Sequence, residues 1–234
     1  RIGNRFTDAQ LQPDADGRFE LYLGTEPQGG NTLVADGDET AIMVRQYYAD
    51  RGTQAPIEVA IEFLGEPATQ LDPPTMAKEL QRSQRMLKAI FERTVGAWKM
   101  ITTMALNRFI QIPGEALFPT PDNTYQVAWY RFGYNQVMLI RGTLPRSRYF
   151  SVTLYNAWME SFDYTRHTIS RNHTRITADA DGRFELCLAH RDPGHPNWLD
   201  TTGHHAGYVL ARNLLLEGEP PELEIQVMYE GEWA

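Results

Sequence analysis

The sequence lacks several features that point to a familiar kind of site. It contains a single cysteine, Cys187, which excludes an intramolecular disulfide and a metal site built from several thiolates. Cys187 alternates with Phe184, Leu186 and Leu188, so we expect a buried thiol in a strand rather than a catalytic one. The chain has no GxGxxG motif, Walker loop or GxSxG elbow, and it therefore carries no nucleotide-binding or hydrolase signature.

Long apolar runs and positive charge are also scarce. No run reaches the roughly 18 to 20 apolar residues that cross a bilayer, and no secretory h-region opens the chain. The formal net charge is −8 and the pI is about 5.3, which argues against a nucleic-acid partner, because phosphate binding needs clustered Lys and Arg. We therefore expect a cytoplasmic protein. Residue 1 is Arg rather than Met, which leaves open the removal of a leader or an upstream domain.

The composition favours a mainly β protein. The 234 residues are enough for one sizeable domain, and we predict a single domain over 1–234. Eleven Tyr, ten Phe and five Trp occur with 14 Pro and 18 Gly, a mixture typical of many short strands and turns.

An internal repeat of about fifty residues supports this expectation. The words DADGRFELYL at 14–23 and DADGRFELCL at 179–188 each predict an Asp-Gly turn that enters a strand. Each is followed by a loop, by an apolar run near an arginine (Arg45 and Arg212), and by a proline with an alternating strand, IEVAIEF or LEIQVMY. We predict a first repeat unit over 14–62 and a pseudo-symmetric pair of strand–loop–strand units. Independent use of Asp-Gly turns is the alternative.

One long helix is predicted between the two copies. Apolar residues recur at steps of three and four from Leu80 to Ala105, which predicts an amphipathic helix over about 75–106 within a helical segment 75–110. Thr75 is the expected N-cap, and Gly96 is the expected site of a break. We expect the apolar stripe to pack on a sheet or on a partner chain, so a homo-oligomer formed through this helix is one expectation.

Three strands are predicted after the helix, at 125–132, 137–144 and 149–155, and they suggest an antiparallel meander. With the second repeat unit, they form a predicted β region over 118–229. The expected fold is an antiparallel jelly-roll-like β-sandwich with the long α-helix beside it.

Three segments together resemble one protein family: PDNTY at 121–125, RYFSVTLYN at 148–156, and HPNWLDTTGH at 195–204 followed by Arg212. They are similar to the bacterial "domain of unknown function 1214" family over roughly Phe118 to Tyr229. The resemblance implies an antiparallel β-sandwich, often preceded by a second domain of unknown function. We expect that larger partner domain to be absent or much shortened here.

The candidate site is the stretch from Ala189 to Arg212, which holds four of the six histidines. Its loop is rich in histidine and aspartate, whereas the corresponding loop of the first copy has no histidine, and function is expected where two copies of a scaffold differ. We predict a small-molecule site without a cofactor, in which His and Asp side chains perform acid–base chemistry. The predicted catalytic residues are His204, Asp200 and His190. The predicted substrate-binding residues are Trp198, Asn197, Arg212, Asn156, Trp158 and His195.

Two other functions stay open. The protein could be a binding module for a carbohydrate or a hydrophobic ligand that stacks on its tryptophans. It could also be a metal-dependent enzyme, with ligands among His190, Asp192, His195, Asp200, His204 and His205, but no spacing within this set is typical of a metal site. We therefore predict no metal ligands, and whether the protein is an enzyme at all is left open.

Overall fold

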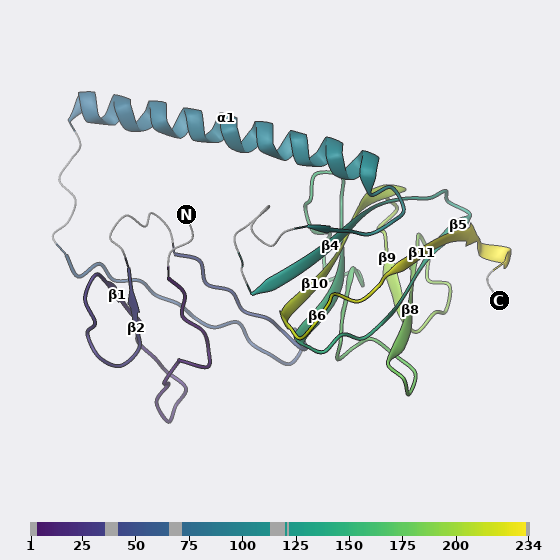
Figure 1. Cartoon of the computed structure of the whole chain (residues 1–234), viewed down its shortest axis with the longest axis horizontal. Helices are drawn as coiled ribbons and strands as arrows, with labels where there is room; N and C mark the ends of the chain where they lie inside the picture. Colours follow the sequence, from purple (N-terminus) through teal and green to yellow (C-terminus); the bar gives the residue numbers. More distant parts are fainter. Residues whose placement is uncertain (1–3, 36–41, 66–71, 113–119, 121, 233–234) are drawn as a thin grey trace. The chain divides into compact units, whose positions relative to one another are not determined.

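The structure is a computed structural model that describes residues 4–35, 42–65, 72–112, 120 and 122–232. The chain separates into two compact units, Arg1–Tyr47 and Tyr48–Ala234. It is mainly β, with a long α-helix (Figure 1). The elements in chain order are β1 (Tyr22–Gly24), β2 (Thr32–Val34), α1 (Pro73–Met104), β3 (Ile110–Ile112), β4 (Asn123–Arg131), β5 (Gln136–Thr143), β6 (Ser147–Tyr155), β7 (Ser170–Asn172), β8 (Arg183–Ala189), β9 (Trp198–Asp200), β10 (Ala206–Leu216), β11 (Glu224–Tyr229) and the 3-10 helix η1 (Glu230–Glu232).

The first unit contains the parallel strand pair β1–β2, in which Leu23 lies opposite Leu33. The strands predicted near Arg45 and at 57–63 are not present, since both segments have no regular secondary structure. A strand needs a neighbour to complete its hydrogen bonds, and an alternating sequence alone does not supply one.

The two predicted Asp-Gly turns are present and have the same geometry. The Asp14 carboxylate accepts hydrogen bonds from the backbone N–H groups of Asp16 at 2.9 Å and Arg18 at 2.8 Å. Asp179 makes the equivalent two bonds in the second copy, also at 2.9 and 2.8 Å. The glycine in each turn has a positive φ, 79° and 78°, which glycine adopts without strain. The repeated word therefore forms the same local structure twice.

Two sheets form the second unit. One has five strands in the order β3-β4-β10-β6-β7, all antiparallel, and the other has four in the order β11-β5-β8-β9. In the four-stranded sheet only β8 and β9 run parallel. The predicted strands β4, β5 and β6 exist, but the predicted meander is wrong. β4 and β6 both pair with β10, while β5 lies in the other sheet. A meander would have placed all three strands in one sheet. Instead, β4 and β6 lie in one sheet and β5 in the other, and apolar side chains of all three strands belong to one buried cluster.

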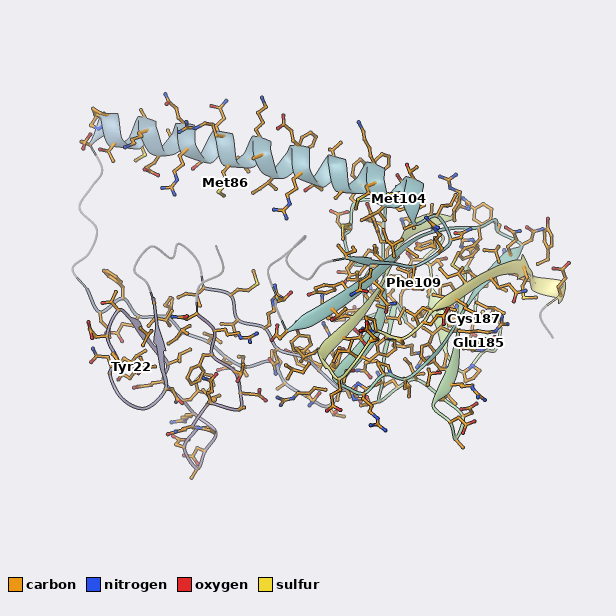
Figure 2. The ribbon with its side chains drawn as sticks, in the orientation of Figure 1. Tyr22, Met86, Met104, Phe109, Glu185 and Cys187 are labelled. Atoms are coloured by element: carbon orange, nitrogen blue, oxygen red, sulfur yellow. The ribbon has the colours of Figure 1, made fainter. Side chains whose placement is uncertain are left out.

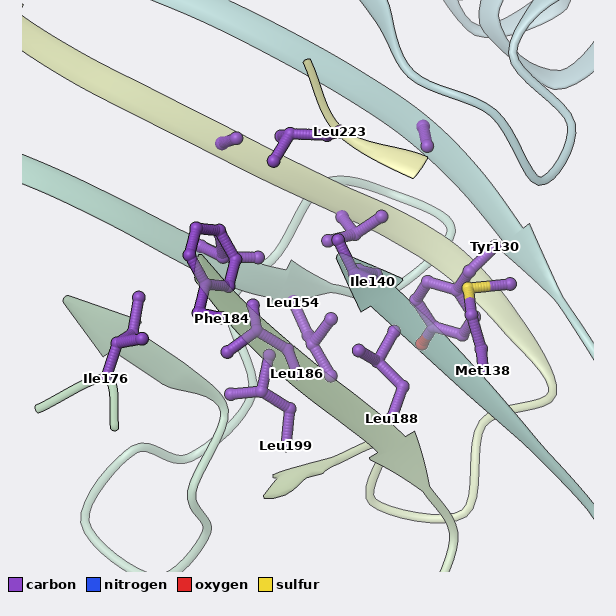
Figure 3. Packing of buried hydrophobic residues seen from close by; sticks show 14 of the residues in the cluster. Tyr130, Met138, Ile140, Leu154, Ile176, Phe184, Leu186, Leu188, Leu199 and Leu223 are labelled. Carbon is purple, nitrogen blue, oxygen red and sulfur yellow. The ribbon is translucent and has the colours of Figure 1, made fainter. Parts of the chain in front are cut away.

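One apolar cluster contains side chains from both sheets. Tyr130 and Leu154 come from the five-stranded sheet, and Ile140, Leu186 and Leu199 come from the four-stranded sheet (Figure 3). Each of these five side chains is at most 1% exposed, so the cluster excludes water from the space that the two sheets share. The sandwich, its jelly-roll topology, the pseudo-repeat and the division into domains stay predictions.

Helix α1 begins two residues before the predicted start. Asp72, not Thr75, is the N-cap, and its carboxylate accepts a hydrogen bond from the Thr75 backbone N–H at 2.9 Å. Pro73 and Pro74 occupy the first turn, where a missing N–H costs nothing. The helix also continues through Gly96 without the predicted break, because one glycine in a helix lowers stability without ending it.

Most of the predicted apolar stripe of α1 is exposed. Only the end of the helix packs on a sheet: Ile101 is buried with side chains of β4 and β10. Leu80, Leu87 and Phe91 are exposed, as is Met86 (Figure 2). A homo-oligomer formed through this face stays a prediction. Within the described residues, no helix combines the length and the apolar character that a membrane span requires.

Candidate functional site

Most of the histidines lie where β8 and β9 end, β10 begins and β4 turns into β5. Ala189 of β8 lies opposite Asp200 of β9, so His190 and the residues after Asp200 leave the sheet together. The His205 carbonyl accepts a hydrogen bond from the backbone N–H of Phe132 at 3.0 Å, which joins the start of β10 to the end of β4. We call this region the histidine end. It comprises Phe132, Tyr134, His167, His190, Asp200, Thr201, His204 and His205.

A histidine–aspartate pair is the most chemically specific feature of the histidine end. His167 Nδ1 lies 2.7 Å from Asp200 Oδ2. A carboxylate only accepts hydrogen bonds, so Nδ1 carries the hydrogen and Nε2 is the ring atom that can take up a proton. The Asp200 carboxylate also accepts a bond from the Thr202 backbone N–H at 2.7 Å, which holds it in place. The His167 side chain is 40% exposed and that of Asp200 is 14% exposed, so a dissolved molecule can reach the imidazole while its carboxylate partner is mostly covered.

His190 lies in an aromatic cluster beside this pair. Its Nδ1 lies 2.7 Å from the hydroxyl oxygen of Thr201, and its ring stacks on Phe132 with 4.9 Å between centroids. The rings of Tyr134 and His205 complete the cluster, at 5.2 and 5.7 Å from His190. Burial lowers the pKa of His190, the neighbouring His205 lowers it further, and contact with the Gly133 backbone partly opposes both effects. His190 is therefore a neutral ring that can form one wall of a site.

His204, the predicted base, has different neighbours from those expected. Its ring lies 4.7 Å from the ring of Phe162, and its Nδ1 lies 3.1 Å from the Thr202 hydroxyl. The imidazole that pairs with Asp200 is His167, which was not among the predicted site residues. The two residues are 33 positions apart, and no spacing along the chain joins them; they meet because the backbone N–H of Asp200 donates to the Thr168 carbonyl at 2.8 Å.

Three of the predicted binding residues make contacts that hold β8 and β9 together. Asn197 is 2% exposed; its amide donates to the carbonyls of Thr177 at 2.7 Å and Glu185 at 2.9 Å and accepts from the Thr177 N–H at 2.8 Å. The indole N–H of Trp198 donates to a β8 carbonyl at 3.2 Å. His195 Nε2 lies 3.4 Å from a Glu185 carboxylate oxygen, and burial lowers the pKa of His195 while Glu185 opposes that effect.

The remaining predicted residues lie elsewhere. The Asn156 side chain closes its own loop, accepting hydrogen bonds from the N–H groups of Trp158 at 2.8 Å and Glu160 at 3.0 Å. Trp158 is 81% exposed. The Arg212 guanidinium lies 5.2 Å from the centroid of the Tyr125 ring. It is six residues into β10, roughly 20 Å from the start of that strand at about 3.3 Å per residue. The structure therefore brings His190, Asp200 and His204 to one end and leaves Arg212 far along the sheet.

An open hollow of about 370 Å³ borders the histidine end. Arg191, Asp192, Pro193 and Glu230 line it. The Glu230 backbone N–H donates to the Asn135 carbonyl at 3.1 Å, which ties the C-terminal side of the hollow to the turn between β4 and β5. The hollow thus offers both signs of charge next to the aromatic cluster. Among the described residues, no group of three His, Cys, Asp or Glu side chains is arranged to hold a metal ion.

Comparisons with known proteins identify a family but no activity. Residues 133–215 match the family described as "Protein of unknown function (DUF1214)". Comparison with curated protein sequences gives no significant match.

Solved structures include one with a similar fold over most of this chain. The crystal structure of an uncharacterised protein from Burkholderia cenocepacia has a TM-score of 0.81 and 25% sequence identity, over 96% of this chain and 63% of that chain. This chain therefore spans less than two thirds of that protein's length. The VPA0106 protein from Vibrio parahaemolyticus has a TM-score of 0.38 and 15% identity over 68% of this chain and 47% of that chain, which is too low to support an argument. The resemblance predicted from the sequence is thus confirmed over residues 133–215, which match the DUF1214 family.

Proposed function

We propose that the histidine end binds a small organic molecule beside the hollow and that His167, oriented by Asp200, transfers a proton to or from it. The short contact between His167 Nδ1 and Asp200 Oδ2 carries this proposal. It fixes the tautomer, and the carboxylate stabilises the imidazolium that forms when Nε2 accepts a proton.

The neighbouring side chains fit an apolar substrate with a polar or charged group at one end. Phe132, Tyr134 and His190 provide ring surfaces, and the hollow adds one positive side chain, Arg191, and two carboxylates, Asp192 and Glu230. His190 is held neutral by burial, so it does not compete with His167 for the proton. The reaction class is a cofactor-free proton transfer, as in a lyase, an isomerase or a hydrolase.

Comparison of histidine variants tests this function. A small-molecule library is screened by ligand-observed NMR against the wild-type chain, and the hits are incubated with wild type, His167→Gln, Asp200→Asn and His173→Gln. His173 is the matched control, because it lies outside the histidine end: its Nδ1 accepts a hydrogen bond from the Phe150 N–H at 3.3 Å, and its ring makes an edge-to-face contact with Tyr149. We expect conversion of at least one hit to fall by about 100-fold or more in the first two variants and to persist in the control. The proposal would be refuted if His167→Gln and Asp200→Asn left both the binding and the conversion of every hit unchanged.

A binding module without catalysis is the second candidate. The observation that favours it is the exposure of two large rings, Trp158 at 81% and Tyr134 at 67%, because exposed aromatic faces stack on sugars and other flat ligands. Hits that bind with loss of affinity in Tyr134→Ala or Trp158→Ala, and that are recovered unchanged after incubation, would support this function over the enzyme.

A further inference from the structure

The first unit repeats a buried hydrogen-bond network of the second unit, bond for bond. Asn31 is 8% exposed, and its amide nitrogen donates to the carbonyls of Gln12 and Glu20, each at 3.1 Å. Its amide oxygen accepts from the Gln12 N–H at 2.7 Å. Asn197 makes the same three bonds to the residues at the matching positions before β8 and within it. The correspondence thus includes side chains far from the shared DADGRFEL word.

The strand pairs that these asparagines join also share their register. The Tyr22 N–H of β1 donates to the Asn31 carbonyl at 2.9 Å, as the Cys187 N–H of β8 donates to the Asn197 carbonyl at 3.2 Å. Both pairs are parallel. By position, β1 therefore corresponds to the last three residues of β8, and β2 corresponds to β9.

The two units differ in what lies on the other edge. In the second unit β5 pairs with β8, and Met138 lies opposite Leu188. In the described part of the first unit the sheet has two strands, so β1 has no such neighbour there. Leu23 takes the place of Leu188 and is 42% exposed, whereas Leu188 is 0% exposed. Phe19 takes the place of Phe184, with 40% exposure against 5%. Tyr22, labelled in Figure 2, lies between these positions in the sequence and is 38% exposed.

The backbone of β1 is also arranged for a third strand. In a parallel pair alternate residues bond to the neighbour, and Tyr22 and Gly24 are the residues of β1 that bond to the β2 side. The N–H and C=O of Leu23 therefore point to the other edge, as those of Leu188 point to β5. A strand edge with apolar side chains is a template for another strand.

We propose that the open edge of β1 binds an antiparallel β-strand whose alternate residues are large and aliphatic, as they are in β5. The partner strand takes the position beside β1 that β5 has beside β8. It forms backbone hydrogen bonds with Leu23 and covers the side chains of Phe19 and Leu23. Such strand addition is a common way for an extended segment to bind a sheet. A second copy of this chain, pairing β1 with β1, is the alternative occupant that the test below distinguishes.

A peptide titration of the full chain tests this proposal. The probe is a fluorescein-labelled peptide with the β5 sequence QVMLIRGT, flanked by lysines for solubility, and the control peptide has proline in place of the methionine and the isoleucine. We expect saturable binding of the first peptide by fluorescence anisotropy and at least tenfold weaker binding of the second, because proline removes the ladder hydrogen bonds. Hydrogen exchange should slow at the Leu23 amide when the first peptide binds.

Two chain variants separate this edge from other apolar surfaces. Leu23→Asp should weaken peptide binding at least tenfold, whereas Leu87→Asp, a matched change at an exposed leucine of α1, should leave it unchanged. Circular dichroism confirms that both variants are folded. Leu23→Thr, which introduces a β-branched residue that suits a strand but is smaller and less apolar than leucine, should give an intermediate affinity. The proposal is overturned if the two peptides bind equally, if no saturable binding occurs, or if Leu23→Asp has no effect. It is also overturned if light scattering finds a dimer that Leu23→Asp abolishes, since the occupant would then be a second copy.

Discussion

Truncation of Asn197 to alanine gives a sharp test of how the strand pair β8–β9 is held. The substitution removes three hydrogen bonds and leaves the Thr177 N–H and the carbonyls of Thr177 and Glu185 without those partners in the interior. A typical hydrogen bond contributes about 1 kcal/mol net, and leaving a buried group unsatisfied costs about 1 to 3 kcal/mol. We therefore expect Asn197→Ala to lower the free energy of unfolding by about 3 kcal/mol. For a domain of this size that corresponds to a decrease in Tm of about 6 to 12 °C.

A second buried asparagine provides the matched control. Asn213 of β10 is 0% exposed, and neither polar atom of its amide has a hydrogen-bond partner within the described residues. Burying an amide without partners costs about 1 to 3 kcal/mol in proteins. We therefore expect Asn213→Leu, which keeps a similar volume, to leave the stability unchanged or to raise it by up to about 2 kcal/mol.

Urea denaturation followed by tryptophan fluorescence measures both changes under the same conditions, with ligand-free protein at pH 7. The prediction is that the free energy of unfolding changes in opposite directions, or not at all for Asn213, at two buried residues of the same type. It fails if Asn197→Ala costs less than about 1 kcal/mol, which would mean that water or a shifted backbone replaces the lost bonds. It also fails if Asn213→Leu is as destabilising as Asn197→Ala, because a buried partner or an ordered water would then satisfy the Asn213 amide.

Three further outcomes follow from local packing and ionisation. Gly207→Ala should destabilise the protein by about 3 kcal/mol in the same denaturation assay, because a Cβ there would overlap the Tyr155 carbonyl oxygen and the Tyr130 hydroxyl; a neutral result would contradict this packing. Burial raises the pKa of Cys187 to about 12, so iodoacetamide at pH 8 should alkylate the unfolded chain but not the folded one, as mass spectrometry can show. Stability should also fall as the pH rises from about 9 towards 12, because the unfolded thiol ionises first. Burial lowers the pKa of His190, so the unfolded state binds that proton first and stability should decrease as the pH falls below about 6.5. In His190→Gln the urea midpoint should depend less on pH between 5 and 7. An unchanged pH dependence in this variant would count against the prediction.

The parts of the fold that depend on local sequence could be predicted. The step of three and four residues along α1 gave a helix within two residues of the observed bounds, 73–104. The Asp-Gly turns before β1 and β8 were identified from their dipeptides, and Cys187 is buried in β8 as its alternation indicated. The three strands after the helix were also placed within two residues, because β-branched and aromatic residues mark strands wherever they pair.

The pairing of those strands could not be read from the same pattern. β4 and β6 are both neighbours of β10, which follows them by about fifty residues or more, and apolar alternation is compatible with several partners. The predicted N-cap at Thr75 failed for a local reason, since Pro73 and Pro74 fix φ for a first turn that starts earlier. Two sequential prolines before a helical pattern are a signal that was available in the sequence.

The candidate site divides in the same way. His190, His204 and His205 lie where polar and aromatic side chains meet, but the concentration of histidines in the sequence did not identify the partner of Asp200. His167 reaches that carboxylate from the loop before β7, and only the tertiary arrangement joins the two. The distance to Arg212 could have been foreseen, because a continuous strand from 206 to 216 carries residue 212 away from its start by roughly 3.3 Å per residue.

Comparison of the two copies also separates the scaffold of the loop from its chemistry. Asn31 and Asn197 make the same three bonds, although the loop before Asn31 contains no histidine and the loop before Asn197 contains two. The hydrogen bonds of this asparagine therefore do not depend on which side chains the preceding loop carries. In both copies the asparagine comes directly before the second strand of a parallel pair, and its bonds help to hold that pair together. Of the pair proposed to transfer a proton, Asp200 lies in the second copy, whereas His167 precedes it. The shared asparagine thus accounts for the strand pairing that places Asp200 at the end of β9, beside the proposed proton-transfer residue His167.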